Sequence, residues 1–210
     1  MISQEIEKYI QNHTTPEDPL LAELNRETHL KVMHPRMLSG HLQGVFLQMI
    51  SQMIHPKQIL EIGTYTGYSA LCLLRGLAPN GLLHTIELNE ELIDFAAKYF
   101  KRVEGGMRIK QYAGEALKII PGIHEQFDLV FIDADKENYL NYYQLVFDKV
   151  RQGGYILADN TLWDGKVIAP KKLDKETRGI VEFNEAVQND KRVTNLLLPI
   201  RDGIMIMKKL

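Results

Sequence analysis

Two apolar stretches of the chain end in oxygen-bearing side chains of the kind that bind hard cations. FDLVFIDADK (127–136) carries Asp133, and GGYILADNTLW (153–163) carries Asp159 and Asn160. If both stretches are parallel strands, these three side chains lie at one edge of a sheet, where α/β proteins place their ligands. An all-oxygen set suits Mg²⁺, Ca²⁺ or Mn²⁺ and disfavours zinc. Either motif alone is better explained by a helix cap or a turn, and only the pair favours a metal site.

A glycine pair follows the first strand-like stretch and opens a helical one. In EIGTYTGYS (61–69) the glycines are Gly63 and Gly67, a spacing that lacks the middle glycine of dinucleotide-binding loops. Glu87 ends the second strand-like stretch, where a carboxylate can accept both ribose hydroxyls of an adenosyl group. Glu61 is a further anchor for a cationic amino group. The glycines alone would be equally consistent with a structural turn, whereas the acid at the end of the second strand favours a nucleoside site.

Helical patterns come before any strand. Residues 2–12 have helical spacing, and a second helix is expected from Thr15 as N-cap, with Pro16 at its first position, to about Val32. A third helix is expected over 41–54. The first quarter of the chain is therefore predicted to be helical.

Strands and helices then alternate. The predicted strands are 58–63, 82–88, 107–113, 127–133, 155–159, 193–200 and 204–209. The predicted helices between them are 67–77, 90–103, 114–120, 137–149 and 174–189. This order indicates βαβ units in a mainly parallel sheet, with a terminal hairpin that adds antiparallel strands. We expect one domain over 1–210, with a helical cap (1–56) and a cofactor- and metal-binding core (57–210).

Composition limits the partners and the compartment. A net charge of −2 gives no overall attraction to nucleic acid or to anionic membranes. The single cysteine, Cys72, excludes an internal disulfide framework and predicts a cytoplasmic protein with a buried thiol. The N-terminal stretch does not read as a signal peptide, and no apolar run approaches the roughly 20 residues of a membrane span.

Several of these motifs together resemble one enzyme family. EIGTYTGYS, Glu87, AGEAL (113–117), FIDADKENYLNY (131–142) and ADNTLW (158–163) resemble the cation-dependent O-methyltransferases of the caffeoyl-CoA and catechol type. The resemblance runs from about Met37 to DGIMI (202–206). It implies an α/β fold, a Rossmann-like S-adenosylmethionine (SAM) methyltransferase sandwich. Such a sandwich has a mainly parallel seven-stranded sheet, an antiparallel C-terminal strand and an N-terminal helical cap.

The resemblance also implies roles for individual residues. The positions that match the cofactor site are Met37, Ser39, Glu61, Gly63, Ser69, Glu87, Ala116, Asp133 and Tyr142. Asp133, Asp159 and Asn160 match the metal site, so Asp133 is shared between the two sites. The family usually has threonine where Ser39 stands, and an acid where Gln43 stands.

Lys136 and Trp163 lie beside the predicted metal site. Lys136 is the candidate general base, since a nearby cation disfavours its ammonium form and lowers its pKa. A solvated surface lysine would be the alternative without the metal. Trp163 is expected either to form a wall for a flat substrate or to pack its own loop. The polar segment 164–179 is a candidate lid.

The predicted reaction is transfer of a methyl group from SAM to one hydroxyl of a vicinal dihydroxy aromatic compound, with a divalent cation, most readily Mg²⁺. The resemblance further implies a homodimer. One alternative is a tRNA hydroxyuridine O-methyltransferase of the same fold, which would need a basic surface around the site. The residues that could supply that surface are Arg36, Lys166, Lys171, Lys172 and Arg178. Another alternative is a nucleotide-binding oxidoreductase or a non-catalytic adenosyl-binding module.

Overall fold

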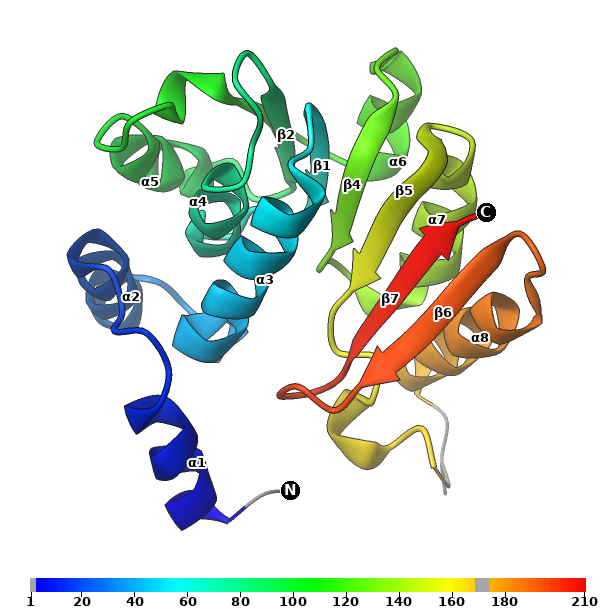
Figure 1. Cartoon of the computed structure of the whole chain (residues 1–210), viewed down its shortest axis with the longest axis horizontal. Coiled ribbons are helices and arrows are strands. Elements are labelled where there is room, and N and C mark those ends of the chain that lie inside the picture. Colours follow the sequence, from blue (N-terminus) through cyan, green and yellow to red (C-terminus); the bar gives the residue numbers. More distant parts are fainter. Residues whose placement is uncertain (1–2, 169–173) are drawn as a thin grey trace.

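The computed structural model describes residues 3–168 and 174–210, which form a seven-stranded sheet with helices on both faces (Figure 1). The strands are β1 (Gln58–Ile62), β2 (Leu82–Glu87), β3 (Ile109–Ala113), β4 (Phe127–Ile132), β5 (Val150–Ala158), β6 (Val193–Leu198) and β7 (Ile204–Lys209). Their order in the sheet is β3-β2-β1-β4-β5-β7-β6. The first five strands are parallel, and β7 is antiparallel to both β5 and β6. The predicted fold class, including the antiparallel C-terminal strand, is confirmed.

Helices cover the two faces in separate groups. The helices are α1 (Gln4–Asn12), α2 (Pro19–Lys31), α3 (Gly40–Ile54), α4 (Tyr68–Leu74), α5 (Glu91–Phe100), α6 (Ala116–Ile119), α7 (Tyr139–Phe147) and α8 (Lys175–Asn189). Side chains of α2 to α5 form one hydrophobic cluster with strand residues such as Ile59 and Phe131. Side chains of α6 to α8 form the other with residues such as Leu60 and Ile132. Neighbouring residues of a strand point to opposite faces, so each buried strand contributes side chains to both hydrophobic clusters.

The predicted start of α2 is wrong by three residues. Asp18, not Thr15, caps the helix, because its Oδ1 accepts the Leu20 N–H at 2.8 Å and Pro19 occupies the first helical position. Both the Thr-Pro and the Asp-Pro pair fit the capping rule. A tertiary contact distinguishes them: Arg75 lies 2.7 Å from Asp18 and lowers the pKa of that carboxyl group.

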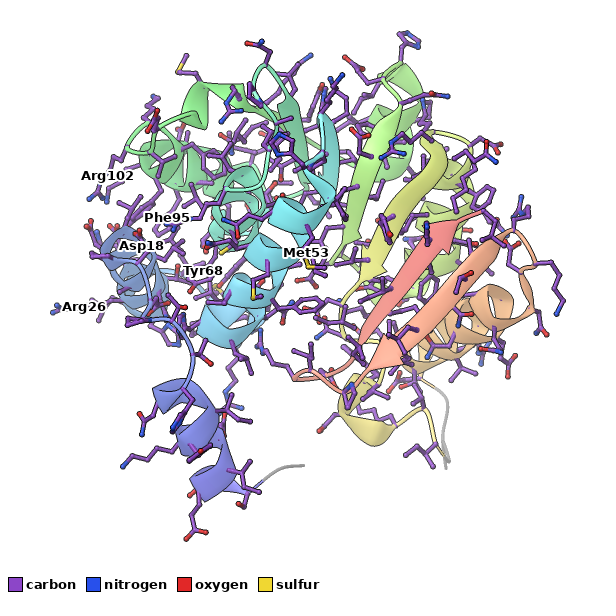
Figure 2. All side chains as sticks on the ribbon, in the orientation of Figure 1. Asp18, Arg26, Met53, Tyr68, Phe95 and Arg102 are labelled. Atoms are coloured by element: carbon purple, nitrogen blue, oxygen red, sulfur yellow. The ribbon has the colours of Figure 1, made fainter. Side chains whose placement is uncertain are left out.

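Polar side chains hold helix α2 and the residues just before it against the rest of the protein, and Figure 2 labels two of them, Tyr68 and Arg102. Arg102, after α5, donates two hydrogen bonds to Glu23 at 2.6 and 2.7 Å. Tyr68, at the start of α4, donates to Glu17 at 2.5 Å. By contrast, α1 extends away from the rest of the chain in Figure 1 and buries none of its residues among the described part of the protein. The anchoring of α2 fixes the start of the segment that leads to α3 across the carboxyl edge of the sheet.

The register of the central strands brings the two acidic motifs together. Ile62 of β1 pairs with Ile132 of β4, which pairs with Ala158 of β5. Asp133 and Asp159 are the next residues along their strands. The predicted shared sheet edge is therefore present in the structure.

Candidate active site

A cavity of about 1560 Å³ opens at the carboxyl edge of the sheet. It lies over the ends of β1, β2, β4 and β5 and beneath the segment before α3. Of the residues predicted for the site, those that line the cavity are Met37, Ser39, Gly63, Ser69, Glu87, Ala116, Asp133, Lys136, Tyr142, Asp159, Asn160 and Trp163. The remaining predicted residue, Glu61, is fully buried, and the nearby charges of Asp133 and Glu87 add to the rise in its pKa that burial causes.

The glycine loop is tied to the neighbouring strands. Gly63 has φ +97°, and its N–H donates to Ile86 O at 3.0 Å. A Cβ at Gly63 would lie 1.9 Å from the main-chain oxygen of Asp133. Only glycine permits this close approach, and it places the loop directly beside the residue shared by the two predicted sites.

Two glutamates present carboxyl groups on the nucleoside side. Glu87 accepts the Tyr65 N–H at 2.6 Å and the Asn89 N–H at 2.9 Å, which fixes its orientation. Glu61 Oε2 accepts the Thr85 hydroxyl at 2.5 Å, while Oε1 is buried and has no hydrogen-bond partner among residues 3–168 and 174–210. Burial raises the pKa of Glu61 to about 8. A buried carboxyl group with a free oxygen fits a cationic donor such as the amino group of SAM.

Asp159, the second acid of the pair at the ends of β4 and β5, is held by hydrogen bonds at both carboxylate oxygens. Asp159 is 2% exposed, and its Oδ1 accepts the Asn160 N–H at 2.7 Å while Oδ2 accepts Nε2 of Gln43 at 2.6 Å. Burial first, and then the charge of Asp133, raise the pKa of Asp159 to about 7. The carboxyl groups of Asp133 and Asp159, beside an amide oxygen on Asn160, form a donor set that fits a hard divalent cation.

Lys136 stands beside this pair in a mostly buried position. Its Nζ lies 3.1 Å from Asp133 Oδ1 and donates to the Tyr139 hydroxyl oxygen at 2.6 Å. The Tyr139 hydroxyl in turn donates to the main-chain oxygen of Asp159 at 3.0 Å. Burial, together with Asp133 and Asp159, raises the pKa of Tyr139 well above its ordinary value. A neutral phenol therefore links the lysine to the acidic pair.

Helix α8 packs against the turn that carries Lys136 and against the loop that follows Asp159 and Asn160. A Cβ at Gly179 would lie 2.3 Å from Lys136 O, so the helix packs closely against the turn that carries this lysine. Asn184 donates to Thr161 O at 2.8 Å, beside the Asp159–Asn160 pair. Residues 175–179 of the candidate lid are therefore helical, and α8 contacts both the turn of the predicted base and the loop of the predicted metal ligands.

Trp163 has features of both roles that were considered for it. Its ring lines the cavity and also packs against the core on the α6–α8 face. Lys136 Nζ lies 6.0 Å from the ring centroid, and Lys166 Nζ lies 5.2 Å from it. Trp163 and Asp164 both have positive φ, near +50°, so the loop is bent sharply there.

Several residues at the cavity, or in contact with its lining, were not predicted from the sequence. Asp135 accepts the Tyr142 hydroxyl, and Tyr139 holds Lys136. Both residues lie inside the FIDADKENYLNY motif, but the sequence does not show which side chains they contact. Arg201 lines the cavity from the turn between β6 and β7, and no local pattern marks it. Of the basic residues considered for tRNA, Arg36 lines the cavity, whereas Lys171 and Lys172 lie outside the described residues, as does the 169–173 part of the candidate lid.

Comparison with known proteins identifies the family of the chain. The profile of the O-methyltransferase family matches residues 11–210. The chain belongs to this family. Caffeoyl-CoA O-methyltransferase 5 of Nicotiana tabacum is 32% identical over 207 residues, which cover 93% of this chain and 86% of the relative. Caffeoyl-CoA O-methyltransferase of Medicago sativa is 35% identical over 180 residues, which cover 80% and 73%.

Solved O-methyltransferases have the same fold and carry the cofactor or its product. The O-methyltransferase of Bacillus cereus in complex with SAH has a TM-score of 0.88 and 30% identity, covering 98% of this chain and 97% of the other. The O-methyltransferase TomG of Streptomyces achromogenes in complex with SAM has a TM-score of 0.91 and 26% identity, covering 100% and 99%. The chain is thus a SAM-dependent O-methyltransferase of the caffeoyl-CoA type, which removes the oxidoreductase and the non-catalytic module from consideration.

No helix in the described part of the chain is long and apolar enough to cross a bilayer.

Proposed function

We propose that this O-methyltransferase needs a divalent cation and methylates one hydroxyl of a vicinal dihydroxy aromatic small molecule. The observation that carries the proposal is the group formed by Asp133, Asp159, Asn160 and Lys136, which lines the same cavity as the cofactor loop. Caffeoyl-CoA O-methyltransferases of plants are similar over most of the chain, which supports a phenolic acceptor.

The nucleoside side of the cavity holds the methyl donor in this proposal. Glu87, with its orientation fixed by two backbone amides, accepts the ribose hydroxyls. Ser69, which lines the cavity, and the buried Glu61, through its free oxygen, would hold the amino-acid end of the donor. Further contacts come from Met37 and Ser39 in the segment before α3, from Gly63, from Ala116 beside the adenine, and from Asp133 and Tyr142.

Asp133, Asp159 and Asn160 would hold the cation, with Mg²⁺ the first choice and Mn²⁺ or Ca²⁺ as alternatives. A bound divalent cation supplies positive charge that stabilises a phenolate and orients two adjacent hydroxyls. Lys136, as the general base, takes the proton of the hydroxyl that becomes methylated. Tyr139 holds the Lys136 nitrogen in place, and Trp163 forms a wall for the flat ring.

The test is a methyl-transfer screen with SAM over catechols, caffeoyl-CoA and tRNA, with and without EDTA. We expect transfer to a vicinal diol that EDTA abolishes, that Mg²⁺ restores and that an equal ionic strength of KCl does not restore. Asp159→Asn should lose the response to Mg²⁺. Transfer that is equally fast in EDTA, or transfer to tRNA alone, would contradict the proposal. We also expect a cytoplasmic homodimer, which size-exclusion chromatography with light scattering can test for its oligomeric part.

A further inference from the structure

A buried side chain on α3 contacts the predicted metal site, although it lies outside the sequence motifs that form this site. Gln43, on α3, is 0% exposed and lies between Asp159 and Arg201. Its Nε2 donates to Asp159 Oδ2 at 2.6 Å, and its Oε1 accepts from Arg201 Nη1 at 3.0 Å. The contacts span three distant parts of the sequence, namely α3, the end of β5 and the turn between β6 and β7.

We propose that Gln43, oriented by Arg201, is a positioning residue that presents Asp159 to the divalent cation. This inference rests on the cation site of the proposed function. It adds two residues that lie beyond the predicted ligands and assigns them a role in cation affinity.

The chemistry of the arginine fixes which way the amide of Gln43 points. A guanidinium group has donors only, so the atom of Gln43 that faces Arg201 must be the oxygen. The amide nitrogen therefore faces Asp159 and always offers it a hydrogen bond. A carboxylate at position 43 would also pair with Arg201, but it could not donate to Asp159.

The result is a carboxylate held at both oxygens. Asp159 Oδ1 accepts the Asn160 N–H at 2.7 Å, and Oδ2 accepts the Gln43 amide at 2.6 Å. Each carboxylate oxygen can accept about two hydrogen bonds or ligand contacts, so each retains a lone pair for a cation. Fixing the rotamer before the cation binds removes an ordering cost from binding, as outer-sphere partners do in other metal sites.

Arg201 is itself held in place and connects the same network to the cofactor side. It has φ +50°, an uncommon conformation for a residue with a side chain, and it donates to the main-chain oxygens of Leu38 at 3.0 Å and of Ser39. The turn that carries it is bonded to the metal loop, since Asp202 O accepts the Leu162 N–H at 2.8 Å. The arginine therefore holds both the amide of Gln43 and the segment that covers the cofactor cavity.

The experiment compares cation and cofactor affinity in matched variants. Gln43→Met keeps the length of the side chain and removes the donor, whereas Gln52→Met makes the same change at an exposed position of α3. Mn²⁺ affinity is measured by electron paramagnetic resonance. Affinity for S-adenosylhomocysteine (SAH) is measured separately in EDTA by calorimetry, so neither readout depends on turnover.

We expect Gln43→Met to weaken Mn²⁺ binding by about 10- to 100-fold, with SAH affinity unchanged within about twofold. Gln52→Met should match the wild type in both. Arg201→Met, in an exposed turn, should weaken Mn²⁺ binding and also SAH binding, and it carries the test if Gln43→Met does not fold.

The outcomes separate the inference from the proposed function. No Mn²⁺ binding by the wild type would overturn the cation site itself. Wild-type Mn²⁺ affinity in a folded Gln43→Met, or in Arg201→Met if Gln43→Met does not fold, would overturn the positioning role alone. An equal loss of Mn²⁺ and SAH affinity in Gln43→Met would assign the residue a general structural role and would also overturn the inference.

Discussion

Replacing Glu61 with glutamine is expected to flatten the pH dependence of stability in the cofactor-free protein. Burial raises the pKa of this carboxyl group from the ordinary 4.5 to about 8. The unfolded chain releases the proton above its ordinary pKa, while the folded protein keeps it up to the raised value. The folded state therefore binds more protons within this window, and the free energy of unfolding falls as the pH rises through it.

The expected size of the effect is large compared with the stability of a domain. Within the window, each pH unit lowers the free energy of unfolding by about 1.4 kcal/mol. Between about pH 5 and about pH 8, the loss that Glu61 causes is on the order of 3 to 4 kcal/mol, against the roughly 5 to 15 kcal/mol of a typical domain. Glutamine has nearly the shape of a protonated glutamate, and its oxygen can still accept the Thr85 hydroxyl, so Glu61→Gln should lack this loss.

Urea unfolding across this pH range, in EDTA and without cofactor, measures the effect. Asp159 titrates in both proteins, so its contribution cancels when the two pH slopes are compared. Glu182→Gln, an exposed change on α8, is the control and should keep the wild-type slope. Equal slopes for the wild type and Glu61→Gln would refute the argument that a buried, protonated Glu61 lies beneath the cavity.

Three further substitutions test other parts of the site. Lys136→Met removes the nitrogen 3.1 Å from Asp133 Oδ1, and we expect kcat to fall by about 10²- to 10⁴-fold with unchanged SAH affinity in calorimetry, as for loss of a general base. Gly63→Ala would place a Cβ 1.9 Å from the Asp133 main-chain oxygen at φ +97°, and we expect a loss of about 2 to 4 kcal/mol in urea unfolding, together with loss of SAH binding. Gly122→Ala, where a Cβ meets no described atom within 4 Å, should leave both unchanged. Gly179→Ala favours the helix by about 1 kcal/mol but drives a Cβ to 2.3 Å from Lys136 O, so we expect lower stability and lower kcat with SAH affinity retained; a more stable, fully active variant would contradict that packing.

The sheet and its functional edge could be predicted because their determinants are local. Each central strand contains a short apolar run, and parallel strands end at one edge whatever their detailed packing. Asp133 and Asp159 directly follow the paired residues Ile132 and Ala158, so knowing the strands was enough to bring the two acids together.

Contacts between distant segments could not be predicted in the same way. The pattern of the last two strands indicates a hairpin, but only the sheet shows that β7 lies between β5 and β6. The sequence shows that Gln43 departs from the family pattern. It does not show the hydrogen bond of Gln43 to Asp159, because the two residues are 116 positions apart. Arg201 occupies an ordinary-looking turn, and its partners on the segment before α3 are more than 160 residues away. Such contacts depend on how the two ends of the chain meet over the sheet, which no local periodicity encodes.

The most direct test of the central claim is methyl transfer from SAM to a catechol or to caffeoyl-CoA, measured before and after chelation. We expect transfer that EDTA abolishes, that Mg²⁺ restores in the wild type and that Mg²⁺ does not restore in Asp159→Asn. Methyl transfer to the same acceptor at an undiminished rate in EDTA would contradict the role of Asp133, Asp159 and Asn160 as a cation site.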